Sequence, residues 1–477
     1  MMGPMGSTTC SDPRYYQMDG PRSDKACIPS GKRVALDSPF LCVPSDGSPL
    51  NLTVSSQLDP HLLSGVARLR VTCGLDMREN REIAVFLAGE TTLLGVFDLR
   101  FAYALQPFEM LLEEKAAKAA LRLGITLQMV KGEENTILLT GMEEPFLNPH
   151  VIFDKDFLNH EWEFAKRLCS DACLQPFGWL EGCVLDGLCA LPWEKQAKAA
   201  VSRHLNYYVR NNDLVYEDPR SSICDGTIYG IECGLPFAVM AREGGYEKPL
   251  RLFRNFVNFF GPGGTITDKE FLSAEGVYTV AYPLAVLACA TEDDTMAQMA
   301  IRQLLVRRDG LVCGKDLYLR NDGGQMLYRN WGRAYVWYLL GLIKTILAFR
   351  KSGISYPKEL EVAFRQVAEH AAPGMKDGLC SVFLHQEETG PDTSSTAGIA
   401  AAFALGYKAE LIPEEYRQKA LQACRTLLTY LTPDGMLTGC SQSNKNGETL
   451  QRSGYRVISQ MAMGLMAHLI DGRGIQR

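Results

Sequence analysis

Apolar positions along the chain follow two different patterns, which meet near residue 150. Before that point, short apolar runs alternate with polar turns, as in "ARLRVTCGL" (67–75) and "EIAVFLAGETTLLGVFDLRF" (82–101). Such runs predict strands, and "ITLQMVKGEENTILLTG" (125–141) predicts a hairpin around its polar loop. One helix is predicted over 109–124, with Gly124 as its stop. We therefore expect a β-rich accessory domain over residues 31–150, after a loosely held, flexible tail over 1–30.

After residue 150 almost every segment has the helical period of apolar residues. Eleven helices are predicted in this region, at 155–172, 192–208, 226–244, 247–260, 273–291, 295–307, 332–351, 357–371, 393–407, 413–430 and 455–470. Asp-Gly pairs recur at 186–187, 309–310, 377–378 and 434–435, and we interpret them as tight turns between helix pairs. Repeated pairs of helices favour a mainly α chain. We expect residues 151–477 to close into an (α/α)6 barrel, a toroid of six helical hairpins. Six hairpins need twelve helices, so we expect one more helix than the pattern reveals.

Composition and charge exclude several classes of partner. The formal net charge is −6 and no basic stripe is present, which argues against nucleic acid as the main partner. Uninterrupted apolar windows of membrane-spanning length are missing from the sequence, and the first twenty residues lack the apolar core of a signal peptide. The fifteen cysteines are scattered without the spacing of a zinc site, so we expect reduced thiols in a cytoplasmic protein. Neither a metal cluster nor a cofactor-binding motif is predicted.

Two acidic residues stand before glycines at the predicted heads of apolar helices. Asp225 precedes Gly226 in "SSICDGTIYG", and Glu275 precedes Gly276 in "FLSAEGVYTV". The simpler interpretation is that each acid caps its helix, with Ser273 completing a capping box for Glu275. The pair lies fifty residues apart, close to one repeat, so both acids would face one cleft from neighbouring inner helices. Paired carboxylates suit acid–base chemistry on a glycosidic or enol ether bond.

A third candidate is the stretch "NWGRAYVWYLLG" (330–341), in which aromatic residues and an arginine crowd the head of an apolar helix. Arg333 presents a rigid fork of donors that matches a carboxylate. Trp331, Tyr335 and Trp337 present flat faces for sugar rings. The alternative is that the aromatic residues belong to the core and that Arg333 pairs with a structural acid.

Two further residues are weaker candidates for substrate binding. His385 lies in a strand-like run before the loop that leads into "DTSSTAGIAAAFALG", and a lone histidine is more often structural than catalytic. Tyr229 follows the first acidic residue by four positions. If the chemistry were elimination rather than hydrolysis, either residue would supply the base, and Arg333 would neutralise the substrate carboxylate.

Four motifs in the same order make the region from Asp225 to about residue 470 resemble the unsaturated glucuronyl hydrolases and their rhamnogalacturonyl relatives. The motifs are "CDGTIYG", "EGVYTVAYPLAVLA", "WGRAYVW" and "DTSSTAGIAAAFALG". The resemblance implies an (α/α)6 barrel that acts on oligosaccharides with a terminal uronic acid. In that family an acid protonates C4 of the unsaturated uronate, water adds at C5, and the hemiketal opens. Carried across, Asp225 and Glu275 become the catalytic pair, and Trp331, Arg333 and Trp337 hold the sugar and its carboxylate.

The chain also departs from the family pattern. Cys224 stands where the family has histidine, and Glu275 replaces aspartate and lies two residues further from its proline. The β-rich region is not part of the usual family chain. Three alternatives therefore stay open: an exo-acting hydrolase of saturated glucuronides (a β-glucuronidase), a polysaccharide lyase on the same toroid, and a non-catalytic toroid that binds sugar or protein. The expected partner is a uronic-acid-containing oligosaccharide, and the β-rich domain offers a face for a homo-oligomer.

Overall fold

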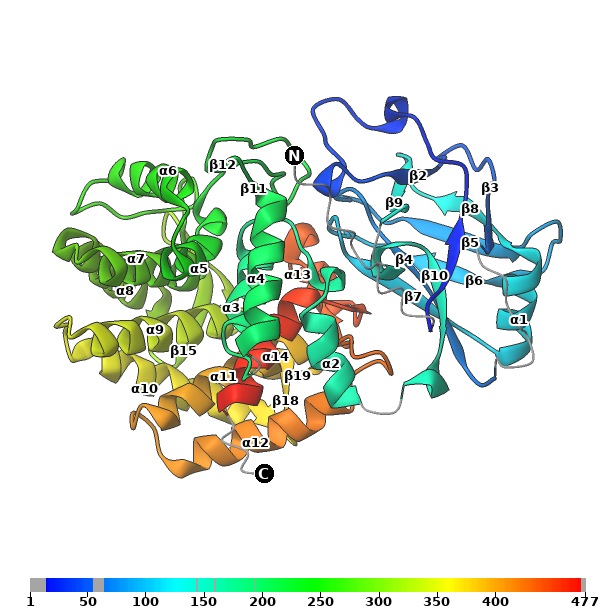
Figure 1. Cartoon of the computed structure of the whole chain (residues 1–477). Helices are drawn as coiled ribbons and strands as arrows, with labels where there is room; N and C mark the ends of the chain where they lie inside the picture. Colours follow the sequence, from blue (N-terminus) through cyan, green and yellow to red (C-terminus); the bar gives the residue numbers. More distant parts are fainter. Residues whose placement is uncertain (1–13, 55–63, 143–144, 158–159, 193, 473–477) are drawn as a thin grey trace. The chain divides into compact units, whose positions relative to one another are not determined.

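The structure, a computed structural model, describes residues 14–54, 64–142, 145–157, 160–192 and 194–472. It divides into two compact units (Figure 1). The β-rich unit comprises residues 1–163 together with 219–222, and the helical unit comprises residues 164–218 and 223–477. The chain is thus mainly helical with a β-rich N-terminal region, as the sequence pattern predicts.

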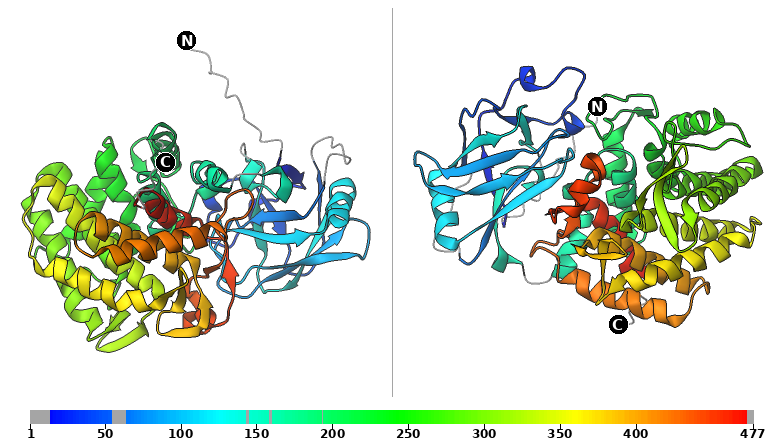
Figure 2. Two further views of the ribbon diagram at one scale, coloured as in Figure 1. Left: turned by 90° about the horizontal axis from the view of Figure 1, so that it is seen from below. Right: turned by 180° about the vertical axis from the view of Figure 1, so that it is seen from behind.

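Eight strands of the β-rich unit form one antiparallel sheet in the order β6-β5-β8-β3-β1-β10-β4-β7. A separate pair joins β2 to β9, and one helix, α1 (Glu114–Leu123), accompanies the strands. The strands are β1 (Tyr16–Asp19), β2 (Phe40–Val43), β3 (Leu50–Val54), β4 (Ala67–Thr72), β5 (Glu82–Leu87), β6 (Leu93–Asp98), β7 (Pro107–Leu112), β8 (Ile125–Lys131), β9 (Thr136–Leu139) and β10 (His150–Phe153). Figure 2 shows them from two further sides.

Two local predictions in this unit are wrong. The tail predicted over 1–30 is wrong for residues 14–30, because β1 lies inside the sheet between β3 and β10, and Tyr15 and Met18 are buried. Residues 1–13 lie outside the described residues. Residues 125–141 do not form a hairpin, because β8 pairs with β3 and β5 whereas β9 pairs with β2. All four residues of β9 are buried, and the strand pairs with β2 rather than with β8, which precedes it in sequence.

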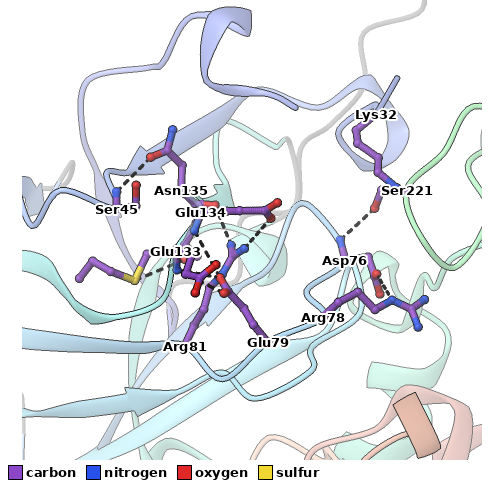
Figure 3. A network of polar contacts seen from close by, with 12 residues as sticks. Lys32, Ser45, Asp76, Arg78, Glu79, Arg81, Glu133, Glu134, Asn135 and Ser221 are labelled. Atoms are coloured by element: carbon purple, nitrogen blue, oxygen red, sulfur yellow. Dashed lines mark hydrogen bonds and ion pairs between the residues drawn. The ribbon is translucent and has the colours of Figure 1, made fainter. Parts of the chain in front are cut away.

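The loop between β8 and β9 is fixed by one carboxylate (Figure 3). Glu79 accepts hydrogen bonds from Arg81 Nε at 2.6 Å and from the backbone N–H groups of Glu133 and Glu134 at 3.1 and 3.3 Å. Arg81 also donates to the Asn135 carbonyl at 2.7 Å. Burial opposes the charge on Glu79, but these donors hold its pKa below the usual value. Hydrogen bonds to Glu79 and Arg81 thus hold this loop in place of the hairpin turn that the sequence suggests.

The helical unit contains the helices α3 to α14 and most of α2, which starts at the boundary between the units. Their bounds are α2 (His160–Leu168), α3 (Trp179–Leu188), α4 (Glu194–Tyr208), α5 (Leu235–Glu243), α6 (Glu247–Asn258), α7 (Tyr282–Thr291), α8 (Asp294–Leu311), α9 (Gly332–Ser352), α10 (Glu359–Ala371), α11 (Thr393–Lys408), α12 (Glu414–Leu428), α13 (Gly447–Arg452) and α14 (Gln460–Gly472). None of the helices in the described residues is long and apolar enough to cross a membrane.

Short strands lie in the connections of this unit. They are β11 (Val209–Arg210), β12 (Asp213–Leu214), β13 (Leu272–Ser273), β14 (Val312–Cys313), β15 (Asp316–Asp322), β16 (Gln325–Arg329), β17 (Met375–Lys376), β18 (Leu379–Phe383), β19 (Gln386–Pro391), β20 (Cys440–Ser441) and β21 (Arg456–Val457). Two single turns matter for the site: η6 (Ile231–Cys233), which is 3-10, and η7 (Val277–Ala281), which is a π-helix.

Six helices contact one another in a closed cycle. The contacts run from α3 to α5, α7, α9, α11 and α14, and from α14 back to α3. The helices α4, α6, α8, α10 and α12 alternate with these along the chain and each packs on a member of the cycle. The members of the cycle are the most apolar helices and are buried on nearly all sides, as expected of helices surrounded by others. The six members of the cycle alternate along the chain with the outer helices, and residues near the carboxyl ends of all six line one cavity. All six therefore run the same way, so their amino ends lie together at the opposite side.

The helix that the sequence pattern did not reveal is α3. Its residues Asp186 and Gly187 were predicted to form a turn, but both are buried inside the helix. Gly187 is needed there because a Cβ at this position would collide with the backbone of Gly464 on α14. The predicted turn at Asp377–Gly378 is confirmed, with positive φ at both residues between β17 and β18. Glycine inside a helix can therefore mark a close helix crossing as well as a turn.

The crossing of α3 and α14 closes the cycle, so it offers a direct test of this packing. Gly187→Ala should destabilise the helical unit by about 1–3 kcal/mol, because the added methyl group has no space. Gly310→Ala in α8 is the matched control: its Cβ meets only the movable end of Leu272, so it should be neutral or stabilise by up to about 1 kcal/mol. Unfolding followed by circular dichroism measures both. Equal effects of the two substitutions would contradict the close crossing.

Candidate active site

Glu275 lies between β13 and the π-helix η7, at the amino end of α7. Its carboxylate accepts a hydrogen bond from Ser273 Oγ at 2.8 Å, and the Ser273 hydroxyl accepts one from the Glu275 backbone N–H at 3.2 Å. The contact with Ser273 that the capping interpretation predicts is therefore present. The Glu275 side chain keeps 13 % exposure, so it is not sealed in the core. A π-helix directly after an acid is notable because single π turns occur frequently at functional sites.

The glycine after Glu275 has a steric cause. A Cβ on Gly276 would collide with the guanidinium of Arg307, which projects from α8. Arg307 is fully buried and donates to the carbonyl oxygens of Ser273 at 2.9 Å and Ile266 at 2.6 Å, and burial lowers its pKa to about 9. These bonds fix the segment that carries Glu275.

Arg320 and Glu232 complete a charged group around Glu275. Arg320 lies on β15, opposite Ser273 of β13, and its Nη2 is 3.7 Å from Glu275 Oε2. Burial opposes the charge on Arg320, but the carboxylates of Glu275, Glu232 and Asp268 hold its pKa above the usual value. The charge of Arg320 is thus stabilised by both glutamates.

The turn that carries Glu232 packs directly on the π-helix. Glu232 lies in η6, and the next glycine, Gly234, has no room for a Cβ because the Thr279 carbonyl of η7 occupies that place. Thr279 in turn donates from its hydroxyl to the Glu275 carbonyl at 3.1 Å. Neither Glu232 nor Arg320 is among the site residues predicted from the sequence. The available signal for Glu232 was an acid two residues before a glycine, Gly234, at the start of an apolar helix.

Asp225 does not head a helix, contrary to the prediction. It lies in an exposed turn, where its Oδ1 accepts a hydrogen bond from the Tyr216 backbone N–H at 2.9 Å, and α5 begins ten residues later at Leu235. Gly226 has φ +65° and open space around it, so glycine is favoured there by backbone conformation. The two acid–glycine pairs therefore arise from different causes, and the pairing of Asp225 with Glu275 remains a prediction.

Tyr229 packs against the amino end of α3. Its hydroxyl occupies the place that a Cβ on Gly178 would need, and Gly178 has φ +122°. The hydroxyl is buried and has no hydrogen-bond partner among the residues that the structure describes. Burial raises the pKa of Tyr229 well above its usual value, so the group is a neutral donor.

Trp331 and Arg333 form one stacked unit at the start of α9. The Arg333 Cζ lies 4.6 Å from the centre of the Trp331 ring, a cation–π contact. Arg333 donates to the Gln442 carbonyl and, at 3.4 Å, to Gln451 Oε1, which also accepts from Trp331 Nε1 at 3.2 Å. Burial opposes the charge of Asp392, but Arg333 is the largest influence that holds its pKa below the usual value. Both interpretations of Arg333 thus have support: it serves a structural acid, and its fork is held in place.

Trp337 lies between α3 and the π-helix. Its ring is 5.5 Å from the Trp179 ring and 6.3 Å from the Tyr278 ring. Within the described part of the chain, its indole N–H is buried without a partner, as are the Nε atoms of Arg320 and Arg333. An unpaired buried donor costs about 1–3 kcal/mol and calls for an explanation, such as a ligand that bonds to it. With the Tyr229 hydroxyl, four such donors accompany the acids at the amino ends of the inner helices.

Tyr335 and His385 belong elsewhere. Both line a cavity of about 250 Å³ whose lining contains neither Glu275 nor Arg333. The Tyr335 hydroxyl donates to Asn330 Oδ1 at 2.8 Å, and burial, followed by the charge of Arg329, lowers the pKa of His385. The six predicted substrate-binding residues therefore fall into two groups. Clusters of three or more potential metal ligands do not occur within the described ranges.

Comparison with known proteins agrees with these features. A model of Glycosyl Hydrolase Family 88 matches residues 320–467, which include Arg320, Trp331, Arg333 and Trp337. None of the curated proteins is a significant match to the sequence.

Several solved structures share the fold at low identity. One, described as a possible member of glycoside hydrolase family 105 from Salmonella enterica subsp. enterica serovar Paratyphi A, has 12% identity and a TM-score of 0.55, covering 66% of this chain and 94% of its own. A family 88 glycosyl hydrolase from Bacteroides vulgatus has 15% identity and a TM-score of 0.51, covering 67% and 98%. An unsaturated glucuronyl hydrolase specific for heparin has 14% identity and a TM-score of 0.50, covering 66% and 95%. The resemblance predicted from the four motifs is confirmed, and the family match supports a glycoside hydrolase.

The role of Arg333 can be tested against its neighbour Arg329, which is exposed and paired with Asp316 at 2.9 Å. Arg333→Lys should raise KM for a terminal uronide about tenfold or more, because an ammonium group cannot reproduce the stacked fork. Arg329→Lys should leave KM within about twofold, since exposed pairs contribute little. Steady-state kinetics with a check of Tm separates binding from folding. An unchanged KM in Arg333→Lys would remove Arg333 from substrate binding.

Proposed function

We propose that the protein is a glycoside hydrolase that removes a terminal unsaturated uronic acid from oligosaccharides, with Glu232 and Glu275 as its paired carboxyl groups. The observation that carries this proposal is Arg320, which lies 3.7 Å from Glu275 and whose charge is also stabilised by Glu232, together with four buried donors that have no partner among the described residues. The match to Glycosyl Hydrolase Family 88 gives the reaction class.

The cycle of inner helices supports the finer fold, a closed (α/α)6 barrel. Twelve helices from α2 to α12 and α14 make six hairpins, with α13 as an insertion in the last. In such a barrel the amino ends of the inner helices form one rim. Glu275, Trp331 and Gly178 all lie at amino ends, and Glu232 lies in the turn before α5. The acids, the stacked arginine and the unpaired donors would therefore share one rim.

The two acids can divide the chemistry. Glu275 accepts a hydrogen bond from the Ser273 hydroxyl and lies 3.7 Å from Arg320, so we assign it the removal of a proton from the attacking water. Glu232 then supplies the proton that C4 of the unsaturated ring takes up. The double bond is consumed, the hydroxyl group from water bonds to C5, and the resulting hemiketal opens to release the neighbouring sugar. One proton is given and one is taken, so the proton count is unchanged, and the proton now on Glu275 passes to Glu232 through solvent before the next turnover.

The remaining residues fit recognition of an acidic sugar. Arg333 is held by Gln442, Gln451 and the Trp331 ring, and its Nε–H stays available for the substrate carboxylate. The indole N–H of Trp337 and the hydroxyl of Tyr229 can bond to ring hydroxyl groups. A neutral sugar has no carboxylate to accept a hydrogen bond from the buried guanidinium of Arg333. We therefore expect uronides to bind more tightly than neutral sugars.

Three substitutions test the assignment of the acids. Glu232→Gln and Glu275→Gln should each lower kcat by about 10²–10⁴, the usual contribution of acid–base catalysis, because a carboxamide can neither give nor take the proton. Asp225→Asn should keep kcat within about threefold, since Asp225 lies in an exposed turn bonded to a backbone amide. The assay follows loss of the C=C absorbance of an unsaturated disaccharide together with release of the second sugar.

The opposite pattern, with Asp225→Asn inactive and Glu232→Gln active, would restore the pair of Asp225 and Glu275. Activity on a saturated glucuronide with none on the unsaturated disaccharide would favour direct glycosidic cleavage. A gain of C=C absorbance from an intact polysaccharide would favour a lyase.

A further inference from the structure

A separate cavity lies at the carboxyl ends of the inner helices, and the proposed hydrolysis does not use it. Its volume is about 460 Å³, within the range of cavities that hold small molecules. All six members of the cycle contribute to its lining through residues near their carboxyl ends, which are Ala190, Arg242, Cys289, Lys351, Leu405 and His468. It is therefore remote from Glu275 and Arg333, which lie at amino ends.

The floor of this cavity is a buried network around one carboxylate. Asp186 of α3 is fully buried and is contacted by five donors from other helices. These are Lys344 Nζ at 2.6 Å, Arg242 Nη2 at 2.8 Å, His468 Nε2 at 3.2 Å, Tyr278 Oη at 2.5 Å and Tyr282 Oη at 3.1 Å. A carboxylate offers about four lone-pair sites, so donors outnumber the acceptor positions.

The lining has an excess of positive charge. Arg242, Lys344 and Lys351 line the cavity, and its lining contains no aspartate or glutamate. Burial and the charge of Arg242 outweigh Asp186 and lower the pKa of Lys344, as expected of a cation that lacks sufficient anionic partners. Arg242 uses one of its five N–H groups for Asp186, and Lys351 has no hydrogen bond or ion pair among the residues that the structure describes.

A simpler explanation of these cations is that they offset the negative ends of the helix dipoles. Arg242 and Lys351 do lie in the last turns of α5 and α9. Lys344 does not, because it lies two turns before the end of α9, beyond the reach of that effect. The cavity walls beside the cations are apolar and include Val286 and Leu347. Converging cations beside an apolar wall are a common arrangement for binding an organic anion.

We propose that this cavity is a second binding site, which takes a small organic anion of monosaccharide size. Its carboxylate or phosphate bonds to Arg242 and Lys351 at the opening, and its apolar face lies on Val286 and Leu347. The two anionic groups share the same chemistry, and the experiment distinguishes them. This inference does not depend on the identity of the substrate at the other rim.

The test uses Cys289, a partly buried thiol in the lining, as a local reporter. The full chain is treated with iodoacetamide in the presence of D-glucuronate, inorganic phosphate or D-glucose, and modification of Cys289 is quantified by mass spectrometry. Protection by glucuronate or by phosphate, but not by glucose, supports the site and names its anionic group. Equal modification under all three conditions at millimolar concentration overturns the proposal.

Variants locate the binding event. Arg242→Met should raise the protecting concentration about tenfold, as expected for loss of a charge-assisted hydrogen bond, and Lys351→Met should raise it severalfold without touching the Asp186 network. Arg251→Met, which removes an exposed cation from α6, is the matched control and should have no effect. Glu275→Gln should retain full protection. Protection lost in Glu275→Gln and unchanged in both Arg242→Met and Lys351→Met would assign the ligand to the catalytic rim and overturn the second site.

Discussion

The helical unit depends on one buried charge, the carboxylate of Asp186. Burial opposes its ionisation, but Lys344, His468 and Arg242 hold its pKa well below the usual value, so it remains an anion in the core. Its partners come from α5, η7, α7, α9 and α14, so one side chain of α3 ties together five other elements. Removing such a carboxylate leaves several buried donors without an acceptor. Loss of one partner of a buried ion pair typically lowers the free energy of unfolding by about 3–5 kcal/mol.

This network also connects the two ends of the inner helices. Tyr278 bonds to Asp186 with its hydroxyl, and its ring faces that of Trp337, which contacts Trp179 at the head of α3. Tyr278 belongs to the same π-helix that follows Glu275. The position of the acid therefore depends on the packing of the core beneath it, from Asp186 through Tyr278, as well as on the bonds from Ser273 and Arg307. A π-helix is an irregular turn, and these contacts on both of its ends explain how it is held.

Sequence patterns predict the helices of this unit well where apolar residues recur with the helical period, and they fail where a charge is buried. α3 was overlooked because Asp186 and Gly187 resemble a surface turn, whereas the partners of Asp186 lie far away along the chain. No local pattern distinguishes a solvated aspartate from one paired with Lys344 and His468. The motif around Arg333 was recognisable because its aromatic and charged residues are adjacent in sequence. Glu232 and Arg320 were not, because they meet Glu275 only after β13 and β15 pair and η6 packs on η7.

The acid–glycine pairs show the same limit. Gly226 follows Asp225 because the turn needs a positive φ, whereas Gly276 follows Glu275 because Arg307 occupies the space of a side chain. Both causes place a glycine after an acid, so the sequence pattern alone does not separate them. A short strand is difficult to predict for a different reason. The four residues of β1, Tyr16–Asp19, carry too little alternation of apolar and polar residues to indicate a strand inside a sheet.

The central claim is that the protein adds a proton and water across the double bond of a terminal unsaturated uronate. Reaction of an unsaturated disaccharide in D2O, followed by NMR from the earliest turnover, tests it most directly. The account predicts one deuterium at C4 of the released uronate, with a single configuration, and loss of the C4=C5 double bond at the rate of sugar release. A released uronate that retains the double bond and carries no deuterium at C4 would contradict it.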